Sequence, residues 1–228
     1  MRTLCIDVGG TGIKGTIYDE SGKALTDRVR IATPRPATPD AVMDVAEAVA
    51  RGAGDFDRVA CGFPGVVVDG VTKNAPNLDG EWGGYRLAAD LELRLGRPAR
   101  AANDADVQGL AVVEGVGTEL VLTLGTGLGS GLYLDGKCLW NLELGHHPWK
   151  DGDSYEDRVD DKTRKRIGTK KWRKRISSMI ATLEPIFNYR KLYLGGGNSE
   201  RLDQADLPAN VVIVDNSAGT LGGLKLWA

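Results

Sequence analysis

The stretch Asp7-Val-Gly-Gly-Thr-Gly-Ile-Lys-Gly15 decides how the rest of the chain is interpreted. It follows a short apolar run, Leu4 to Ile6, which predicts a first β-strand. Its glycines remove side chains where the backbone must turn and approach another group closely. A glycine loop beside an acid is typical of sites that bind phosphate and a hydrated metal ion. We therefore expect a phosphate-binding loop, with Mg²⁺ near Asp7, whose carboxylate would orient a water on the metal. The alternative is an Asp that only bonds its own loop.

The residues after this loop distinguish it from a dinucleotide-binding loop. The spacing Gly10-x-Gly12-x-x-Gly15 also fits the dinucleotide fingerprint, but that fingerprint requires a helix directly after the loop. Instead, apolar residues between Ile13 and Ile31 fall at odd positions, and the residues from Asp19 to Lys23 are typical of a turn. The pattern predicts strand, loop, strand and turn, which disfavours the Rossmann alternative.

The same pattern returns about half a chain later. An apolar strand is expected from Leu120 to Leu124, a glycine loop over 125–131, and a second strand from Leu132 to Leu134. Gly10-Thr11-Gly12 and Gly125-Thr126-Gly127 lie 115 residues apart, and Tyr18 and Tyr133 share that offset. We interpret this as two related lobes that each contribute a phosphate loop. Ordinary tight turns are the alternative, both here and for a third glycine loop at Gly195, Gly196 and Gly197.

Asp104 is the first candidate for catalysis. A short strand, Ala99 to Ala102, is expected to end just before Asn103-Asp104, and a helix is expected to follow to about Glu114. Phosphoryl transfer to a hydroxyl requires a carboxylate that positions the hydroxyl and accepts its proton. The alternative is that Asp104 is the N-cap of the helix.

Two further groups have the chemistry to bind a polar ligand. Glu143 and His146 have i, i+3 spacing, which places both on one side of a helical turn, whereas a zinc site would need more ligands nearby. Asn77 and Asp79 share a loop with Trp82, so an amide and a carboxylate could bind sugar hydroxyls while the ring covers an apolar face. The alternative for Asn77 and Asp79 is that their side chains only cap the loop.

Composition and charge narrow the class of protein. The 228 residues are 42% hydrophobic and 26% charged, which is ordinary for a soluble globular chain. The net charge of -2 gives no global field toward nucleic acid or an anionic membrane, and no apolar run is long enough to span a bilayer. Three widely separated cysteines form neither a disulfide framework nor a CxxC motif, and no signal peptide is evident. We expect a cytoplasmic protein with no nucleic-acid or membrane partner.

A basic run follows an acidic stretch in the second half of the chain. We interpret it as the solvated side of helices, screened by the acids between Asp151 and Asp161; a track for a polyanion is the alternative. Its members are Lys162, Arg164, Lys165, Arg166, Lys170, Lys171, Arg173, Lys174 and Arg175.

With these residues in place, the chain resembles the ROK family of sugar kinases and, within it, the polyphosphate glucokinase branch. The resemblance rests on an ordered set of motifs spread over nearly the whole chain. These are Asp7 to Gly15, Thr33-Pro-Arg-Pro-Ala-Thr-Pro39, Gly62-Phe-Pro-Gly65, Ala75-Pro-Asn-Leu-Asp79 with Trp82, Asn103-Asp104-Ala-Asp106, Leu122 to Ser130, Glu143-Leu-Gly-His146 and Gly195-Gly-Gly197.

The resemblance implies an α/β, actin-like ATPase (ribonuclease H-like) fold with two lobes around a cleft. The lobes would be residues 1–102 and 103–216, with a final helix, 217–228, packed back on the first. Asp104 would activate a sugar hydroxyl, and the sugar would be held by Asn77, Asn103, Glu143 and His146. The donor phosphates would be bound by Gly9, Gly10, Thr11, Gly12, Lys14, Gly125, Thr126 and Gly127, with Gly195 to Gly197 near a nucleotide.

The resemblance also implies a hexose kinase, most simply one that phosphorylates glucose at the 6-OH from polyphosphate or ATP, as a homodimer. The family's Cys-rich zinc segment is missing, as in the polyphosphate branch, so no structural zinc is expected. No DNA-binding segment precedes Met1, so we expect an enzyme rather than a repressor. The segment His147-Pro-Trp-Lys150 differs from the established polyphosphate enzymes, which leaves the donor and the sugar open. A non-catalytic sugar sensor of the same fold is the rival hypothesis.

Overall fold

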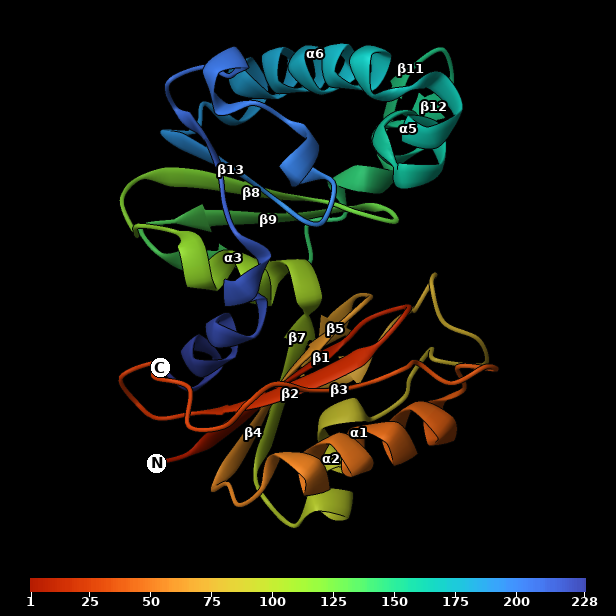
Figure 1. The fold of residues 1–228 in the computed structure, drawn as a ribbon, viewed down its shortest axis with the longest axis vertical. Helices are drawn as coiled ribbons and strands as arrows, with labels where there is room; N and C mark the ends of the chain where they lie inside the picture. The colour runs from red at the N-terminus through yellow and green to blue at the C-terminus, as the bar shows by residue number, and fades with distance from the viewer. The chain divides into compact units, whose positions relative to one another are not determined.

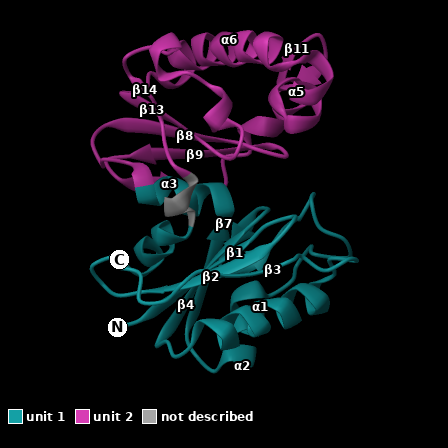
Figure 2. Cartoon of the chain, in the orientation of Figure 1, with its two compact units in different colours: residues 1–111, 218–228 teal, residues 112–217 magenta. Residues whose placement is uncertain are grey.

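The computed structural model describes residues 1–215 and 220–228 of the chain. The chain forms two compact units, one of Met1–Ala111 with Ala218–Ala228 and one of Val112–Ser217. Figure 2 shows the first unit in teal and the second in magenta. Each unit is built around its own five-stranded sheet.

The sheet of the first unit has the strand order β3-β2-β1-β4-β7. Strands β1, β4 and β7 are parallel, whereas β2 and β3 run antiparallel to their neighbours. The strands are β1 (Thr3–Val8), β2 (Ile13–Tyr18), β3 (Val29–Ile31), β4 (Arg58–Phe63) and β7 (Ala99–Asn103), with a small hairpin of β5 (Val67–Val68) and β6 (Val71–Thr72). The helices are α1 (Pro39–Ala53), α2 (Leu87–Leu95) and α3 (Asp104–Val112).

Helices α1 and α2 cover one face of this sheet (Figure 1). Helix α1 begins with Pro39, which is tolerated in a first turn because that N–H has no helical acceptor. Its buried residues Val42, Ala46 and Val49 recur at helical spacing and pack against the alternate apolar residues of β1. The apolar residues of the strand, which alternate, and those of the helix, which recur every three to four residues, therefore form a single core.

The described part of the C-terminal segment packs in the first unit, on α3 and on the sheet. Gly223 lies against Cys5 and Ala60, and Gly222 approaches the carbonyl of Val107 too closely for any side chain. The last element, η4 (Asn216–Trp227), is a 3-10 helix, and its side chains are described from Thr220 onward.

The sheet of the second unit has the order β10-β9-β8-β13-β14. Its strands are β8 (Thr118–Leu124), β9 (Leu128–Leu134), β10 (Lys137–Leu139), β13 (Lys191–Gly195) and β14 (Val211–Ile213). A hairpin of β11 (Pro148–Lys150) and β12 (Asp153–Ser154) follows β10 and η1. The helical elements are η1 (Leu144–His146), α4 (Tyr155–Val159), α5 (Asp161–Ile167), α6 (Thr169–Phe187), η2 (Ser199–Arg201) and η3 (Gln204–Asp206).

Helix α6 supplies most of the helical side of the second core. Trp172 is fully buried, and its indole N–H donates to the carbonyl of Val159 at 2.7 Å. Gly168, at φ 81°, is the N-cap of this helix, and Thr169 is its first helical residue. A positive φ at that position favours glycine over a capping side chain.

The two sheets have the same strand order and the same strand directions. The first residues of β1 and β8, Thr3 and Thr118, are 115 residues apart, and so are Ile13 and Leu128, which begin β2 and β9. The predicted repeat is therefore confirmed as a repeat of topology. Because a strand and not a helix follows Gly12, the Rossmann alternative is wrong.

The second glycine loop is shorter than the sequence indicated. Strand β9 already begins at Leu128, and Leu128 pairs with Leu124, so Gly129 and Gly131 are strand residues. The reason is that the antiparallel hydrogen bonds between β8 and β9 involve only backbone groups, so the ladder continues through these glycines. In both described parts of the chain, no helix is long and apolar enough to cross a membrane.

Candidate functional site

The carboxyl ends of three parallel strands gather the expected residues of the first unit at one sheet edge. Asp7 of β1 is in register with Gly62 of β4, and Gly62 is in register with Ala102 of β7. The residues that follow Ala102, Asn103 and Asp104, therefore lie at the same edge as Asp7. Ligands of open α/β sheets bind at such carboxyl ends.

The glycine loop after β1 has its carbonyl groups bound and its N–H groups available. Its first N–H, of Gly9, donates to the carbonyl of Gly12 at 3.1 Å. The carbonyls of Gly9, Gly10 and Thr11 accept hydrogen bonds from Thr33 Oγ1 (2.5 Å), Arg35 Nη2 (2.9 Å) and Arg30 Nη2 (3.2 Å). Within residues 1–215 and 220–228, the N–H groups of Gly10 and Thr11 donate to no protein acceptor. Such a concavity of free N–H groups is suited to an anion.

Arg30 lies directly against Gly12 of the first glycine loop. A Cβ on Gly12 would lie 2.7 Å from Nη2 of Arg30 and 2.8 Å from Nε. The guanidinium therefore lies against the loop backbone, where it adds a positive charge beside the free N–H groups. Sequence reasoning missed Arg30, because a charged residue in an edge strand has no signature of its own; the neighbouring Thr33-to-Pro39 motif marked only Thr33 and Arg35.

Asp7 is paired with Lys14 across the hairpin. The two residues face each other in the β1–β2 register, and Lys14 Nζ lies 3.0 Å from Asp7 Oδ2. The side chain of Asp7 is only 16% exposed, so this is a partly desolvated pair. The described residues include no cluster of three or more His, Cys, Asp or Glu side chains able to hold a metal ion. A cation at Asp7 would therefore need ligands from a bound phosphate as well.

The cap of α3 is Asn103, not Asp104. Asn103 Oδ1 accepts from the N–H groups of Ala105 (2.9 Å) and Asp106 (3.2 Å), which is the bonding pattern of an N-cap. Asn103 Nδ2 donates to the carbonyl of Gly65 at 3.2 Å. The capping alternative for Asp104 is therefore wrong, because β7 extends one residue further than expected and makes Asn103 the last residue before the helix.

Asp104 is the first residue of α3 and is partly exposed. Its Oδ1 accepts from the N–H of Ala105 at 2.8 Å. Gly62 of β4 lies beside it, since the Cβ position of Gly62 is 3.4 Å from the Asp104 Cα. Negative charge at a helix N-terminus is stabilised by the helix dipole, which favours the ionised carboxylate.

The loop between β6 and α2 places Asn77 beside the first glycine loop. The backbone carbonyl of Asn77 lies 3.7 Å from the Cβ position of Gly10, and its side chain is exposed. Asp79 accepts from the N–H of Ala37 at 2.8 Å and lies 3.4 Å from Arg35 Nη1. Arg35 therefore connects this loop to the carbonyl of Gly10.

Trp82 does not have the role expected for it. It is 2% exposed, its ring lies 4.9 Å from that of Phe63, and its N–H donates to the carbonyl of Asp79 at 3.0 Å. The prediction that its ring covers a sugar face is wrong. The physical reason is that its apolar area is buried in the first core, where it anchors the loop.

The two glycine loops of the second unit lie side by side. Gly125 N donates to the carbonyl of Gly127 at 3.0 Å, so this loop is also closed by a bond between its own peptide groups, one residue tighter than the bond between Gly9 and Gly12. The carbonyl of Gly125 accepts from Asn198 Nδ2 at 3.2 Å, just after the Gly195-Gly196-Gly197 loop. In the described chain, the N–H groups of Thr126 and Gly127 have no protein acceptor. This loop has the same character as the first.

Glu143 and His146 are brought together as their spacing predicts. Glu143 Oε2 lies 3.3 Å from His146 Nδ1, across the single turn η1. Burial raises the pKa of Glu143; His146 acts to lower it and Glu156 to raise it further. The pair therefore offers an acceptor and a ring nitrogen on one side of a turn.

Glu156 is a site residue that sequence reasoning missed. Its Oε2 accepts from the N–H of Leu128 at 2.7 Å and lies against Gly127, while its charge acts on Glu143. It connects the second glycine loop to the Glu143–His146 pair. Nothing in the acidic stretch Asp151 to Asp161 distinguished Glu156 from its neighbours.

Comparison with known proteins matches residues 3–154 to the ROK family. The chain is 32% identical over 232 residues to polyphosphate glucokinase of Mycobacterium tuberculosis (strain CDC 1551 / Oshkosh), covering 95% of this chain and 88% of that one.

Two solved structures agree with this. Inorganic polyphosphate/ATP-glucomannokinase from Arthrobacter sp. strain KM has a TM-score of 0.89 at 35% identity and covers 100% of this chain and 99% of its own. A ROK family glucokinase from Streptomyces griseus, in complex with glucose and AMPPNP, has a TM-score of 0.83 at 21% identity, with 99% of both chains covered, and supports the fold alone. The actin-like ATPase fold expected from the sequence is confirmed. From these matches and the repeated sheets with their glycine loops, we conclude that the chain belongs to the ROK family and is a kinase that transfers phosphate to a sugar hydroxyl.

Proposed function

We propose that this sugar kinase transfers a phosphoryl group from polyphosphate or ATP to glucose, at the 6-OH. The observation that carries the proposal is the position of Asp104, at the carboxyl end of β7 and relieved of helix capping by Asn103. A carboxylate in that position is able to accept a proton from a hydroxyl. The polyphosphate glucokinase relatives support glucose as the acceptor, and the Arthrobacter polyphosphate/ATP-glucomannokinase supports both donors and adds mannose as a possible acceptor.

In the proposed reaction, the sugar hydroxyl oxygen attacks the terminal phosphorus of the donor. The hydroxyl proton passes to Asp104, and the bond from phosphorus to the leaving phosphate oxygen breaks. Asn77, Asn103, Glu143 and His146 would hold the sugar. The free N–H groups of the loops at Gly9 to Gly12 and Gly125 to Gly127 would hold donor phosphates, with Lys14 and the Gly195–Gly197 loop as further contacts.

Mg²⁺ would be held at Asp7 through water, together with oxygens of the donor. One carboxylate plus substrate phosphates is an ordinary environment for Mg²⁺, which keeps several of its waters. When bound, it would supply positive charge to the phosphates during transfer. Lys14 already neutralises Asp7 in the described structure, so the site fits a metal only when a phosphate is present. We extend the proposal to a cytoplasmic homodimer on the strength of the family resemblance.

A phosphorylation assay with ATP and long-chain polyphosphate in parallel tests the proposal. We expect glucose 6-phosphate from at least one donor in the presence of Mg²⁺. Mannose and N-acetylmannosamine, assayed beside glucose, would identify a different acceptor. Sugar binding measured by calorimetry without transfer from either donor would instead support the rival hypothesis, a non-catalytic sugar sensor.

The affinity for the sugar should fall as the pH is lowered, and this fall should begin at a higher pH than it would if Glu143 had the pKa of an ordinary glutamate. Burial raises the pKa of Glu143 above its usual 4.5, so the charged acceptor is present above that raised pKa and is lost as the pH falls through it. We expect the KM for glucose to rise in this window. A Glu143→Gln variant should have a weaker affinity and no such rise; an unchanged pH profile in that variant would contradict the role of Glu143.

A further inference from the structure

Helices α5 and α6 expose a band of cations that the proposed site does not use. In the part of the chain that the structure describes, the exposed members have no carboxylate oxygen within 4.0 Å. We call these residues the α5–α6 cationic face: Lys162, Arg166, Lys170, Lys171, Arg173 and Lys174. Because the whole chain carries a net charge of -2, this face is a local and not a global feature.

The acids that precede the face in sequence do not neutralise it. Asp151 and Asp153 pair with Arg158, at 3.0 and 3.2 Å. Asp160 accepts from the N–H of Thr163 as the cap of α5. Asp161 pairs with Arg164 and Lys165. The expected screening of the basic run is therefore wrong for the six residues of the face, because these acids are bound to other partners.

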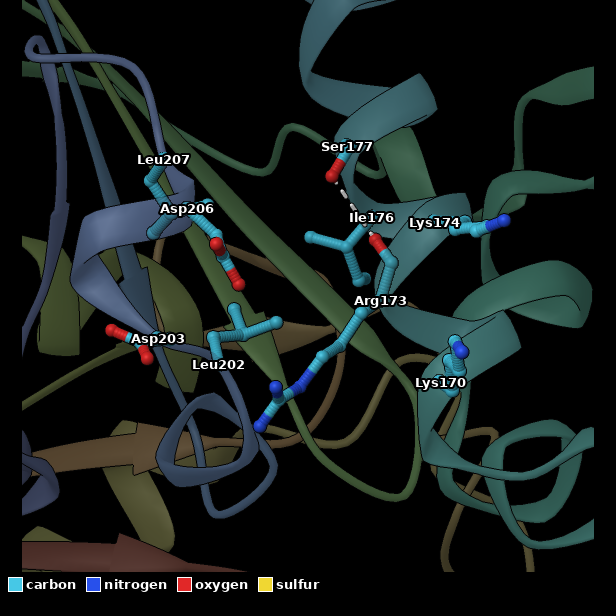
Figure 3. A pocket seen from close by; sticks show the side chains of 9 residues that line it. All are labelled: Lys170, Arg173, Lys174, Ile176, Ser177, Leu202, Asp203, Asp206 and Leu207. Atoms are coloured by element: carbon cyan, nitrogen blue, oxygen red, sulfur yellow. Dashed lines mark hydrogen bonds between the residues drawn. The ribbon is translucent and has the colours of Figure 1, made fainter.

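A groove of about 280 Å³ separates the face from the segment that follows β13. Figure 3 shows Lys170 and Lys174 on the α6 side of the groove and Asp203 and Asp206 on the other. The two carboxylates would repel an anion from the far wall, so an anion is favoured along the α6 side. Lys170 and Lys174 are one helical turn apart and exposed, which places two cations about 6 Å apart along the helix axis.

Hydrogen bonds connect this face to the two glycine loops of the same unit. The first N–H of α5, of Asp161, donates to the carbonyl of Gly125 at 3.1 Å. Arg173 Nε donates to the carbonyl of Arg201 at 2.5 Å, at the end of η2, and Ser199 N donates to the carbonyl of Gly196 at 2.9 Å. The groove therefore begins one short turn after the Gly195–Gly197 loop. An anionic chain whose end is bound at the glycine loops could therefore extend along the α5–α6 cationic face.

We propose that the α5–α6 cationic face binds a long inorganic polyphosphate donor beyond its reacting end. The proposal rests on the donor site assigned above to the glycine loops. A linear polymer with a charge on every unit matches a row of separate cations, whereas a short phosphate compound would meet few of them. Nucleic acid is disfavoured, because single strands are held by stacking on aromatic rings and Trp172, the aromatic residue of this run, is fully buried.

The test compares a Lys170→Gln/Lys171→Gln/Lys174→Gln variant with the native enzyme. We expect its KM for long-chain polyphosphate to rise about tenfold or more and its salt dependence to weaken, because binding to a polyanion releases counterions for each cation involved. The KM values for glucose, ATP and tripolyphosphate should change by less than about twofold, since short donors do not reach the face. The matched control, Lys23→Gln/Arg28→Gln/Lys137→Gln, removes the same charge from exposed positions outside the face and should behave as the native enzyme.

Each outcome has a distinct meaning. An unchanged KM for long-chain polyphosphate in the face variant, or an equal rise in the control variant, overturns the proposal. An enzyme that uses only ATP also overturns it, although the proposed sugar phosphorylation would still be supported. If no sugar is phosphorylated from any donor, the proposed function fails. In that case, equilibrium binding of long-chain polyphosphate to the native and variant chains tests separately whether the α5–α6 cationic face binds polyphosphate. If a single-stranded DNA of the same charge competes equally well for this binding, polyphosphate is not the specific partner of the face.

Discussion

Replacing Asp104 by Asn is expected to lower kcat for sugar phosphorylation by about 10²–10⁴-fold, the usual contribution of a general base. The variant keeps the size of the side chain and one acceptor oxygen for the N–H of Ala105, but it cannot accept the hydroxyl proton. The fold should be unaffected, because the N-cap of α3 is provided by Asn103 and not by Asp104. Steady-state rates with saturating glucose and donor, measured beside thermal denaturation, check both expectations.

The neighbouring position provides the control. An Asn103→Ala variant loses the cap of α3, which costs about 1 kcal/mol, so its Tm should fall by about 2–4 °C. It also loses the hydrogen bond to Gly65. The two variants should therefore differ: Asp104→Asn has a low kcat and a native Tm, whereas Asn103→Ala has a lower Tm and, because Asn103 is proposed to hold the sugar, a higher KM for glucose. Near-native turnover by Asp104→Asn would remove Asp104 from the mechanism.

A Gly196→Ala substitution is expected to destabilise the second unit by about 3 kcal/mol or more, from backbone strain and overpacking together. Gly196 has a φ of 82°, in the left-handed region, and its Cβ would lie 2.5 Å from the backbone nitrogen of Leu124 and closer still to the carbonyl oxygen. Both obstacles are backbone atoms at the end of β8, which cannot move away without shifting the Gly125 loop. We expect Tm to fall by about 6–12 °C and the KM for the donor to rise.

Gly197 is the matched control for this substitution. Among the described residues, nothing lies within 4 Å of its Cβ position, and its φ is not in the left-handed region. A Gly197→Ala variant should keep the native Tm. Any change in the KM for the donor would then mean that the added methyl group occupies space that the donor needs. Equal stability of the two variants would show that the close contact between Gly196 and Leu124 is not required.

The local patterns of the sequence predicted most of the secondary structure around the site. Short apolar runs indicated β1 and β8, and apolar residues at alternate positions indicated β2. The 115-residue repeat predicted two related sheets, and the i, i+3 spacing of Glu143 and His146 predicted their contact. These predictions succeed because each depends on neighbours in sequence, where backbone geometry alone fixes which side chains share a face.

Other properties depend on contacts between segments far apart in sequence, and these predictions failed or could not be made. Trp82 is a core residue because Phe63 and Ala37 converge on it. Arg30 reaches the carbonyl of Thr11 from another strand, and Glu156 reaches Leu128 from a helix 28 residues later. Screening of the basic run failed for a different reason: the acids before it bind Arg158, Arg164, Lys165 and the N–H of Thr163, which are not part of the α5–α6 cationic face.

The sequence by itself determined that two glycine loops follow matching strands and that Asp104 lies where a strand gives way to a helix. Only the tertiary structure decided how those loops are prepared for an anion. Arg30, Thr33 and Arg35 bind the carbonyls of the first loop, and Asp161 and Asn198 bind the first carbonyl of the second. The physical reason is that a peptide group presents its N–H to a ligand when its position is fixed by partners, and those partners come from distant parts of the chain.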